Sequence, residues 1–174
     1  MEPSDSSSAA DAVTLRGPFD RPDFARLGCL LVLCVVVALF LAHATKFSHH
    51  TTDDAFISFR YARHLATGKG LTYNPPVRVE GYSNLSWILM LTACHRSGVD
   101  PLDASKTLGM LLGVLSLPLT FLATWMLVDR RKATWPLFST CLLAGSSSFA
   151  LWCVGGLETP LYAVLLLGLA ICLQ

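Results

Sequence analysis

Long apolar runs separated by polar segments dominate this sequence of 174 residues, covering 27–44, 104–128, 133–152 and 160–174. An α-helix needs about 20 apolar residues to cross about 30 Å of hydrocarbon. The first three runs therefore predict membrane-spanning helices, although hydroxyl side chains dilute the third. Hydrophobic residues make up 53% of the chain and charged residues only 14%. We expect an all-α membrane protein built as a polytopic helix bundle.

Two apolar stretches are too short to span a membrane comfortably. The run 160–174 ends without a charged anchor, which predicts an incomplete fourth membrane helix. We therefore expect the chain to be the N-terminal part of a larger polytopic protein or a truncated gene product. The stretch 85–94 is too short at about 1.5 Å per residue. It predicts a helix over about 85–96 that lies along the membrane surface.

Basic residues suggest which segments face the cytoplasm. The Ser/Ala/Asp/Pro-rich segment 1–26 contains arginines close to the first apolar run and predicts a disordered cytoplasmic leader. A basic cluster at 129–132 predicts a second cytoplasmic point, separated from the first by two crossings. It follows that 45–103 is a long extracytoplasmic loop and that 153–159 is a second outer loop.

Two alternatives to this topology stay open. The long loop is itself as basic as the expected cytoplasmic parts, which leaves room for the inverted orientation. The small residues at Ala42 and Ala44 have the form of a signal-peptide cleavage site, although the apolar run is long for a signal peptide.

The cysteines show neither a disulfide pattern nor a zinc pattern. All of them lie in or beside apolar runs, and none forms a C-x-x-C pair. We expect thiols buried in the membrane that behave as small hydrophobic side chains. The six residues are Cys29, Cys34, Cys94, Cys141, Cys153 and Cys172.

Polar chemistry concentrates at the start of the long loop. Asp53 and Asp54 precede a helical pattern over about 54–67, which places Arg60 and Arg63 on one face. Capping by Asp53 and solvated or headgroup-bound arginines would explain these residues without a substrate. Beside a membrane, a carboxylate can also accept a proton from a hydroxyl group, and arginines can bind a lipid phosphate.

The rest of the loop carries groups suited to sugar hydroxyls. Arg78, Glu80 and Tyr82 alternate along the chain, so they lie on one face of a strand or extended segment. An ordinary exposed strand would explain the same spacing. Asn84 begins an N-glycosylation sequon, but we expect it to cap the following helix.

A metal site is a further alternative in this loop. His49 and His50 could combine with Asp53 and Asp54, although adjacent residues rarely converge on one ion. Magnesium or manganese bound to the carboxylates through water would leave no stronger mark in the sequence. We name no metal ligands and keep a divalent cation as a candidate cofactor.

These residues resemble a known family. The sequence "DDAFISFRYARHLATGKGLTYNPPVRVEGYSN", followed by "LWCVGGLETPLYAVLLLGL", is similar to the N-terminal region of bacterial membrane glycosyltransferases of the GT-C architecture. It most resembles terminal arabinofuranosyltransferases, over about residues 51–169. The double aspartate with its arginine helix is the more specific motif, and the Gly-Leu-Glu motif ending at Glu158 supports it by position.

The resemblance implies an inverting transferase in the bacterial plasma membrane, with its active face outside the cytoplasm. A sugar would pass from a polyprenyl-phosphate donor to a glycan, lipid or protein acceptor of the cell envelope, with no nucleic-acid partner. Asp53 is then the candidate base, Asp54 its partner in orienting acceptor or donor, and Arg60 and Arg63 candidates for the phosphate. Glu158 would face the same cavity, unless it only favours the dipole of the next helix.

Two other classes remain as alternatives. A non-catalytic membrane subunit would bind a lipid-linked sugar without turnover. A transporter would place charged residues near the middle of its membrane helices. Lys106 and Glu158 lie only near helix ends, which disfavours the transporter.

Overall fold

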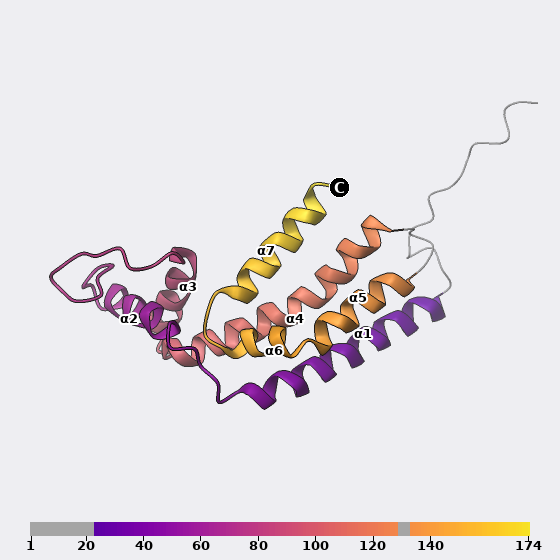
Figure 1. Ribbon diagram of the computed structural model, residues 1–174, viewed down its shortest axis with the longest axis horizontal. Coiled ribbons are helices and arrows are strands. Elements are labelled where there is room, and N and C mark those ends of the chain that lie inside the picture. Colours follow the sequence, from indigo (N-terminus) through magenta and orange to yellow (C-terminus); the bar gives the residue numbers. More distant parts are fainter. Residues whose placement is uncertain (1–22, 129–132) are drawn as a thin grey trace, which may run out of the picture.

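The computed structural model describes residues 23–128 and 133–174, and every regular element in these ranges is helical (Figure 1). The expectation of an all-α fold is confirmed for these ranges, which contain no strand. The elements are α1 (Asp23–Ala44), the short 3-10 helix η2 (Thr45–Phe47), α2 (Ala55–Ala66), α3 (Leu85–Arg96), α4 (Pro101–Leu127), α5 (Thr134–Gly145), α6 (Ser147–Val154) and α7 (Thr159–Cys172).

Two helices are long and apolar enough to cross a membrane. They are α1 continued by η2, with an apolar span Leu27–Phe47, and α4, with the span Pro101–Leu127. A third crossing results if α5 and α6 together form one bent span. The described residues are therefore consistent, by length and composition, with an all-α membrane protein. The shorter α7 matches the expected short fourth helix in position.

The third apolar run is not one straight helix. It divides into α5 and α6, which meet at an angle of 59°. Ser146 lies at the break, where its side chain accepts a hydrogen bond from Phe149 N and caps α6. His43 of α1 contacts both sides of the break, with Nδ1 at 3.4 Å from Ala144 O and Nε2 at 3.2 Å from Ser147 Oγ. These hydroxyl-rich residues were expected only to dilute the span, but they allow it to bend.

Small residues let the helices of the bundle approach closely. A Cβ atom on Gly109 of α4 would overlap the carbonyl oxygen of Cys153 in α6. One on Gly113 would lie only 2.6 Å from Cys153 Sγ and 3.0 Å from Phe40 Cζ. Spacing two glycines by four residues places both on one helix face. Through this glycine face, α4 packs closely against α6 and α1.

The helices α2 and α3 form a separate unit at one end of the bundle (Figure 1). Their core consists of large side chains, among them Phe59, Tyr61, Trp87 and Leu91, all almost completely buried. The predicted helix over 54–67 is observed at Ala55–Ala66, and α3 has the predicted bounds. The chain turns after α2 at Gly68, whose φ of +79° favours glycine.

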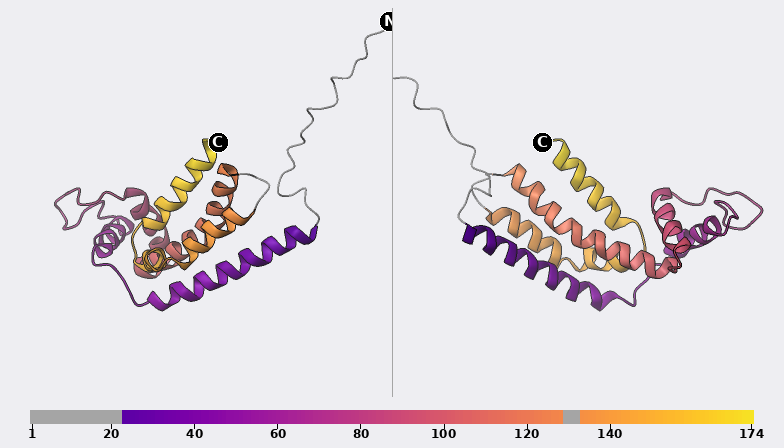
Figure 2. Two further views of the ribbon diagram at one scale, coloured as in Figure 1. Left: turned by 45° about the vertical axis from the view of Figure 1, so that its right-hand side comes forward. Right: turned by 180° about the vertical axis from the view of Figure 1, so that it is seen from behind.

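The connections expected on one side of the membrane lie at the same end of the helix bundle. The segment after α1, the α2–α3 unit and the connection from α6 to α7 lie at one end, whereas α4 ends and α5 begins at the other (Figure 2). The disordered leader predicted for 1–26 lies outside the described residues up to position 22, and α1 already begins at Asp23. The basic turn at 129–132 also lies outside them.

Candidate functional site

Backbone groups, not the aspartate side chains, begin helix α2. Ala55 N, Phe56 N and Ile57 N donate to the carbonyl oxygens of Thr52, Asp53 and Asp54. Asp54 occupies the N-cap position, with no side-chain cap hydrogen bond. The capping role considered for Asp53 is therefore wrong, because the preceding turn already satisfies the first amides. Both carboxylates are exposed and lack a hydrogen-bond partner among the described residues.

A cavity of about 230 Å³ brings together three of the candidate residues. Asp54 enters it from the start of α2, Tyr82 from the connection to α3, and Glu158 from the start of α7. Ser58 lies one helical turn after Asp54, so both side chains reach the same cavity. The complete lining is Asp54, Ile57, Ser58, Gly81, Tyr82, Ser83, Asn84, Leu157 and Glu158.

The double glycine before Glu158 fixes its place against the α2–α3 unit. Gly155 O accepts a hydrogen bond from Thr52 N at 2.9 Å, and Gly156 O accepts one from Trp87 Nε1 at 3.1 Å. Gly156 has φ +92°, and a Cβ there would lie 2.9 Å from Ala55 Cβ. Only glycine combines that backbone conformation with so close an approach. The Gly-Leu-Glu motif thus carries Glu158 to the cavity.

Asn84 and Ser58 are site residues that the sequence reasoning missed. Asn84 Nδ2 donates to Glu158 Oε2 at 2.8 Å and to Ser58 Oγ at 2.9 Å. Asn84 occupies the N-cap position of α3 but makes no capping hydrogen bond. Its burial also makes the sequon unsuitable for glycosylation. One feature of the sequence could have indicated this part of the site: Ser58 is a polar residue on the apolar face of the predicted helix.

The arginines of α2 bind protein groups outside this cavity. Arg60 donates to Tyr73 O and to Asn74 Oδ1, both at 2.7 Å, and stacks over the Tyr73 ring at 4.6 Å. Arg63 forms an ion pair with Asp100 at 2.8 Å. Their proposed phosphate contacts remain untested, since these bonds explain both positions structurally.

The partner of Arg63 also caps a membrane helix. Asp100 is the N-cap of α4 and accepts a hydrogen bond from Leu102 N at 2.9 Å. Burial acts to raise the pKa of Asp100, but the hydrogen bonds from Leu102 and Arg63 outweigh it and hold that pKa below its usual value. The ion pair therefore ties the end of α2 to the start of α4.

The expected alternating face at Arg78, Glu80 and Tyr82 is not part of a strand. This segment is irregular, and only an isolated bridge between Asn74 and Val77 lies near it. Tyr82 packs edge-on against Tyr61 with ring centroids 4.9 Å apart. Arg78 and Glu80 are exposed and do not line the cavity.

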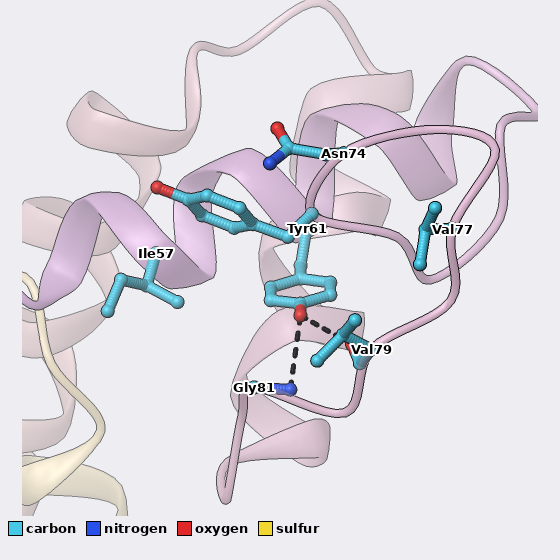
Figure 3. Close-up of a pocket in the computed structure, with 7 residues that line it drawn as sticks. Ile57, Tyr61, Asn74, Val77, Val79 and Gly81 are labelled. Carbon is cyan, nitrogen blue, oxygen red and sulfur yellow. Dashed lines mark hydrogen bonds between the residues drawn. The ribbon is translucent and has the colours of Figure 1, made fainter.

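A larger cavity of about 500 Å³ adjoins the first but contains none of the candidate residues. Figure 3 shows it beside Tyr61, whose hydroxyl donates to Val79 O and accepts from Gly81 N. Its lining is mostly apolar, with Ile57 and Val77 on opposite sides. The two cavities share Ile57 and Gly81, so they are neighbours. The carboxylates identify the smaller one as the candidate site.

The described residues form neither a metal-binding cluster nor a disulfide. Within residues 23–128 and 133–174, no group of three or more His, Cys, Asp or Glu side chains is arranged to hold a metal ion. His49 and His50 therefore do not form a cluster with Asp53 and Asp54. All six cysteines are free, but only Cys153 is buried. Of the others, Cys29 and Cys94 are half-buried within the chain, whereas Cys34, Cys141 and Cys172 lie on helix surfaces.

Comparisons with protein-family models, with curated proteins and with solved structures find no match to this chain.

Proposed function

We propose that this chain belongs to a bacterial membrane glycosyltransferase that moves a sugar from a polyprenyl-phosphate donor to a cell-envelope glycan or related acceptor. The observation that carries the proposal is the shared cavity of Asp54 and Glu158 at one end of the membrane helices. A donor with a lipid tail in the bilayer would present its sugar at this level. The GT-C resemblance supports the same reaction and an extracytoplasmic site in the plasma membrane.

Asp54 replaces Asp53 as the proposed base. Both side chains are free of capping bonds, but only Asp54 lines the cavity. The acceptor hydroxyl would attack the anomeric carbon as the bond from that carbon to the phosphate oxygen breaks, and its proton would pass to Asp54. One displacement inverts the anomeric centre. Glu158 and Tyr82 would bind sugar hydroxyl groups.

The phosphate that leaves needs positive charge nearby. No lysine, arginine or histidine is among the cavity-lining residues. A divalent cation that arrives bound to the donor phosphate could supply this charge. Such an ion would neutralise charge on the departing phosphate. Arg60 could contribute only after releasing Tyr73 and Asn74, which makes it the weaker candidate.

Turnover of the two aspartate variants tests this assignment. The complete product of the gene that encodes this chain is assayed in membranes with a polyprenyl-phosphate sugar donor and an envelope acceptor extract. We expect Asp54→Asn to lower the rate by about 100-fold or more while donor binding persists. The neighbouring Asp53→Asn is the matched control and should retain most of the activity.

Three results would contradict the proposal. Equal activity of Asp54→Asn and wild type would show that Asp54 is not the base. Loss of activity in Asp53→Asn alone would assign the base role to Asp53. Donor binding without transfer by the wild type would instead favour a non-catalytic subunit that binds a lipid-linked sugar.

A further inference from the structure

The side-chain amide of Asn84 uses both of its hydrogens inside the candidate site. One is donated to Glu158 Oε2 at 2.8 Å and the other to Ser58 Oγ at 2.9 Å. Ser58 is 3% exposed and Asn84 is 7% exposed. Ser58 Oγ also lies 3.4 Å from Asn84 Oδ1, to which it can donate. The amide therefore links α2, the start of α3 and the start of α7.

This arrangement determines which way the amide faces. If the amide were rotated by half a turn, Asn84 Oδ1 would face the Glu158 carboxylate, and two acceptors would oppose each other. Ser58 can donate and accept, so it tolerates either orientation. Glu158 does not, because an ionised carboxylate only accepts. The carboxylate and the amide hold each other in one geometry.

The contact with Asn84 occupies one carboxylate oxygen of Glu158 and leaves the other oxygen without a hydrogen bond among the described residues. Only Oε2 has a hydrogen-bond partner among the described residues. The remaining oxygen belongs to a side chain that lines the cavity together with Asp54 and Tyr82, the other titratable groups in its lining. A carboxylate held in this way can accept a charge-assisted hydrogen bond from a ligand hydroxyl.

We propose that Asn84 is a positioning residue, which holds Glu158 so that its second oxygen is presented to a sugar hydroxyl group in the cavity. Ser58 supports this role by fixing the orientation of the Asn84 amide. The sugar part of the inference rests on the proposed transferase function. The positioning part rests on the hydrogen bonds alone and has a test of its own.

The test of the positioning role replaces the hydrogen-bond donor, the Asn84 amide, with a hydrogen-bond acceptor of the same size. In Asn84→Asp, two carboxyl groups face each other, repel when both are ionised, and form a hydrogen bond when they share a proton. We expect the Tm of the purified chain in detergent to fall by about 4 °C or more at about pH 8, and by clearly less at about pH 5. Ser86→Asp, at an exposed position of α3, is the matched control and should show no such pH dependence.

A second substitution should reverse the effect. In the double variant Asn84→Asp with Glu158→Gln, the new amide can donate to the new carboxylate, so the bond is restored with its direction reversed. We expect the Tm to recover toward the wild-type value and the pH dependence to disappear. An Asn84→Asp protein with the wild-type Tm at both pH values would overturn the positioning role. So would a double variant no more stable than the single one.

Turnover separates the positioning role from the sugar role. The rescued double variant lacks the Glu158 carboxylate, so in the transferase assay we expect its KM for the donor to rise about 10-fold or more. An unchanged KM would overturn the sugar role while leaving the positioning intact. Absence of turnover in the wild type would overturn the proposed function and the sugar role together, and the melting series would still decide the role of Asn84.

Discussion

The membrane bundle and the α2–α3 unit differ in the side chains that make their closest helix contacts. In the bundle, leucines such as Leu39, Leu111 and Leu166 are exposed, and glycines allow the closest helix contacts. In the α2–α3 unit, Trp87 and Tyr61 are buried. Lipid is as apolar as leucine, so burying large side chains drives association only where water is the solvent. The same chain therefore follows two packing rules.

Polar side chains differ between the two regions as well. In the bundle, Ser116 donates to Leu112 O and Thr140 to Pro136 O, each within its own helix. Side-chain bonds between bundle helices are made by His43 and by the Thr124–Ser139 pair. In the α2–α3 unit, Arg60 and Asn84 join segments far apart in the sequence. Hydroxyls that satisfy themselves locally suit a lipid environment. Of the bonds made by Arg60 and Asn84, those of Asn84 join residues that line the candidate cavity.

The largest expected contrast is in accessibility from outside the cell. In a background with every cysteine replaced, single cysteines are introduced at Ser83, Thr159 or Ala133. A membrane-impermeant thiol reagent should label intact cells at Ser83 and Thr159 and leave Ala133 unlabelled. Ser83 precedes α3 and Thr159 begins α7, and these helix starts lie at the end of the bundle that carries the α2–α3 unit (Figure 1). Labelling only at Ala133 would invert the orientation and place the cavity in the cytoplasm.

The next contrast separates a buried tryptophan from an exposed one. Trp87→Ala removes a completely buried ring and its hydrogen bond to Gly156 O, so unfolding should become easier by about 3–5 kcal/mol. Trp135→Ala is the matched control, since that ring is 59% exposed on α5. Thermal unfolding in detergent measures both. Equal effects would show that the α2–α3 unit has no water-driven core.

A glycine pair tests the packing rule of the bundle. Gly109→Ala introduces a methyl group against the backbone of Cys153, so α4 and α6 must separate at a cost of about 1–3 kcal/mol. Gly168→Ala on α7 meets nothing within 4 Å and should be neutral or slightly stabilising. The same unfolding measurement compares the pair. A tolerated Gly109→Ala would indicate that the helices do not approach so closely.

The smallest expected effect concerns the ion pair that joins the two regions. The pKa of Asp100 is held below its usual value of 3.8, so the pair contributes stability above about that pH and loses it as the pH falls further. Asp100→Asn should remove this dependence while keeping the helix cap. Because Arg63 and Asp100 are 47% and 44% exposed, we expect about 1 kcal/mol or less. Acid titration of unfolding would detect it, and an identical titration curve for both proteins would contradict the prediction.

Local patterns predicted the helices better than the site. The α2 and α3 bounds followed from apolar periodicity and from Gly68, both of which act within a few residues. The bend at Ser146 was missed because hydroxyls are tolerated in straight membrane helices too. The two motifs that contain Asp54 and Glu158 were picked out in the sequence. That Asn84 joins Glu158 to Ser58 depends on how distant helices pack, which periodicity does not encode.

The backbone contacts of Gly155 and Gly156 have a consequence for the order of events during synthesis. The α2–α3 unit leaves the ribosome well before these glycines, yet Thr52 N and Trp87 Nε1 find their acceptors only on them. Until the connection from α6 to α7 has been made and packed in place, the cavity lacks its Glu158 wall and Asn84 lacks its carboxylate partner. A nascent chain stalled before Gly155 would therefore expose these donors to water or chaperones. The cavity is therefore complete only when α6 and the start of α7 have packed against the α2–α3 unit.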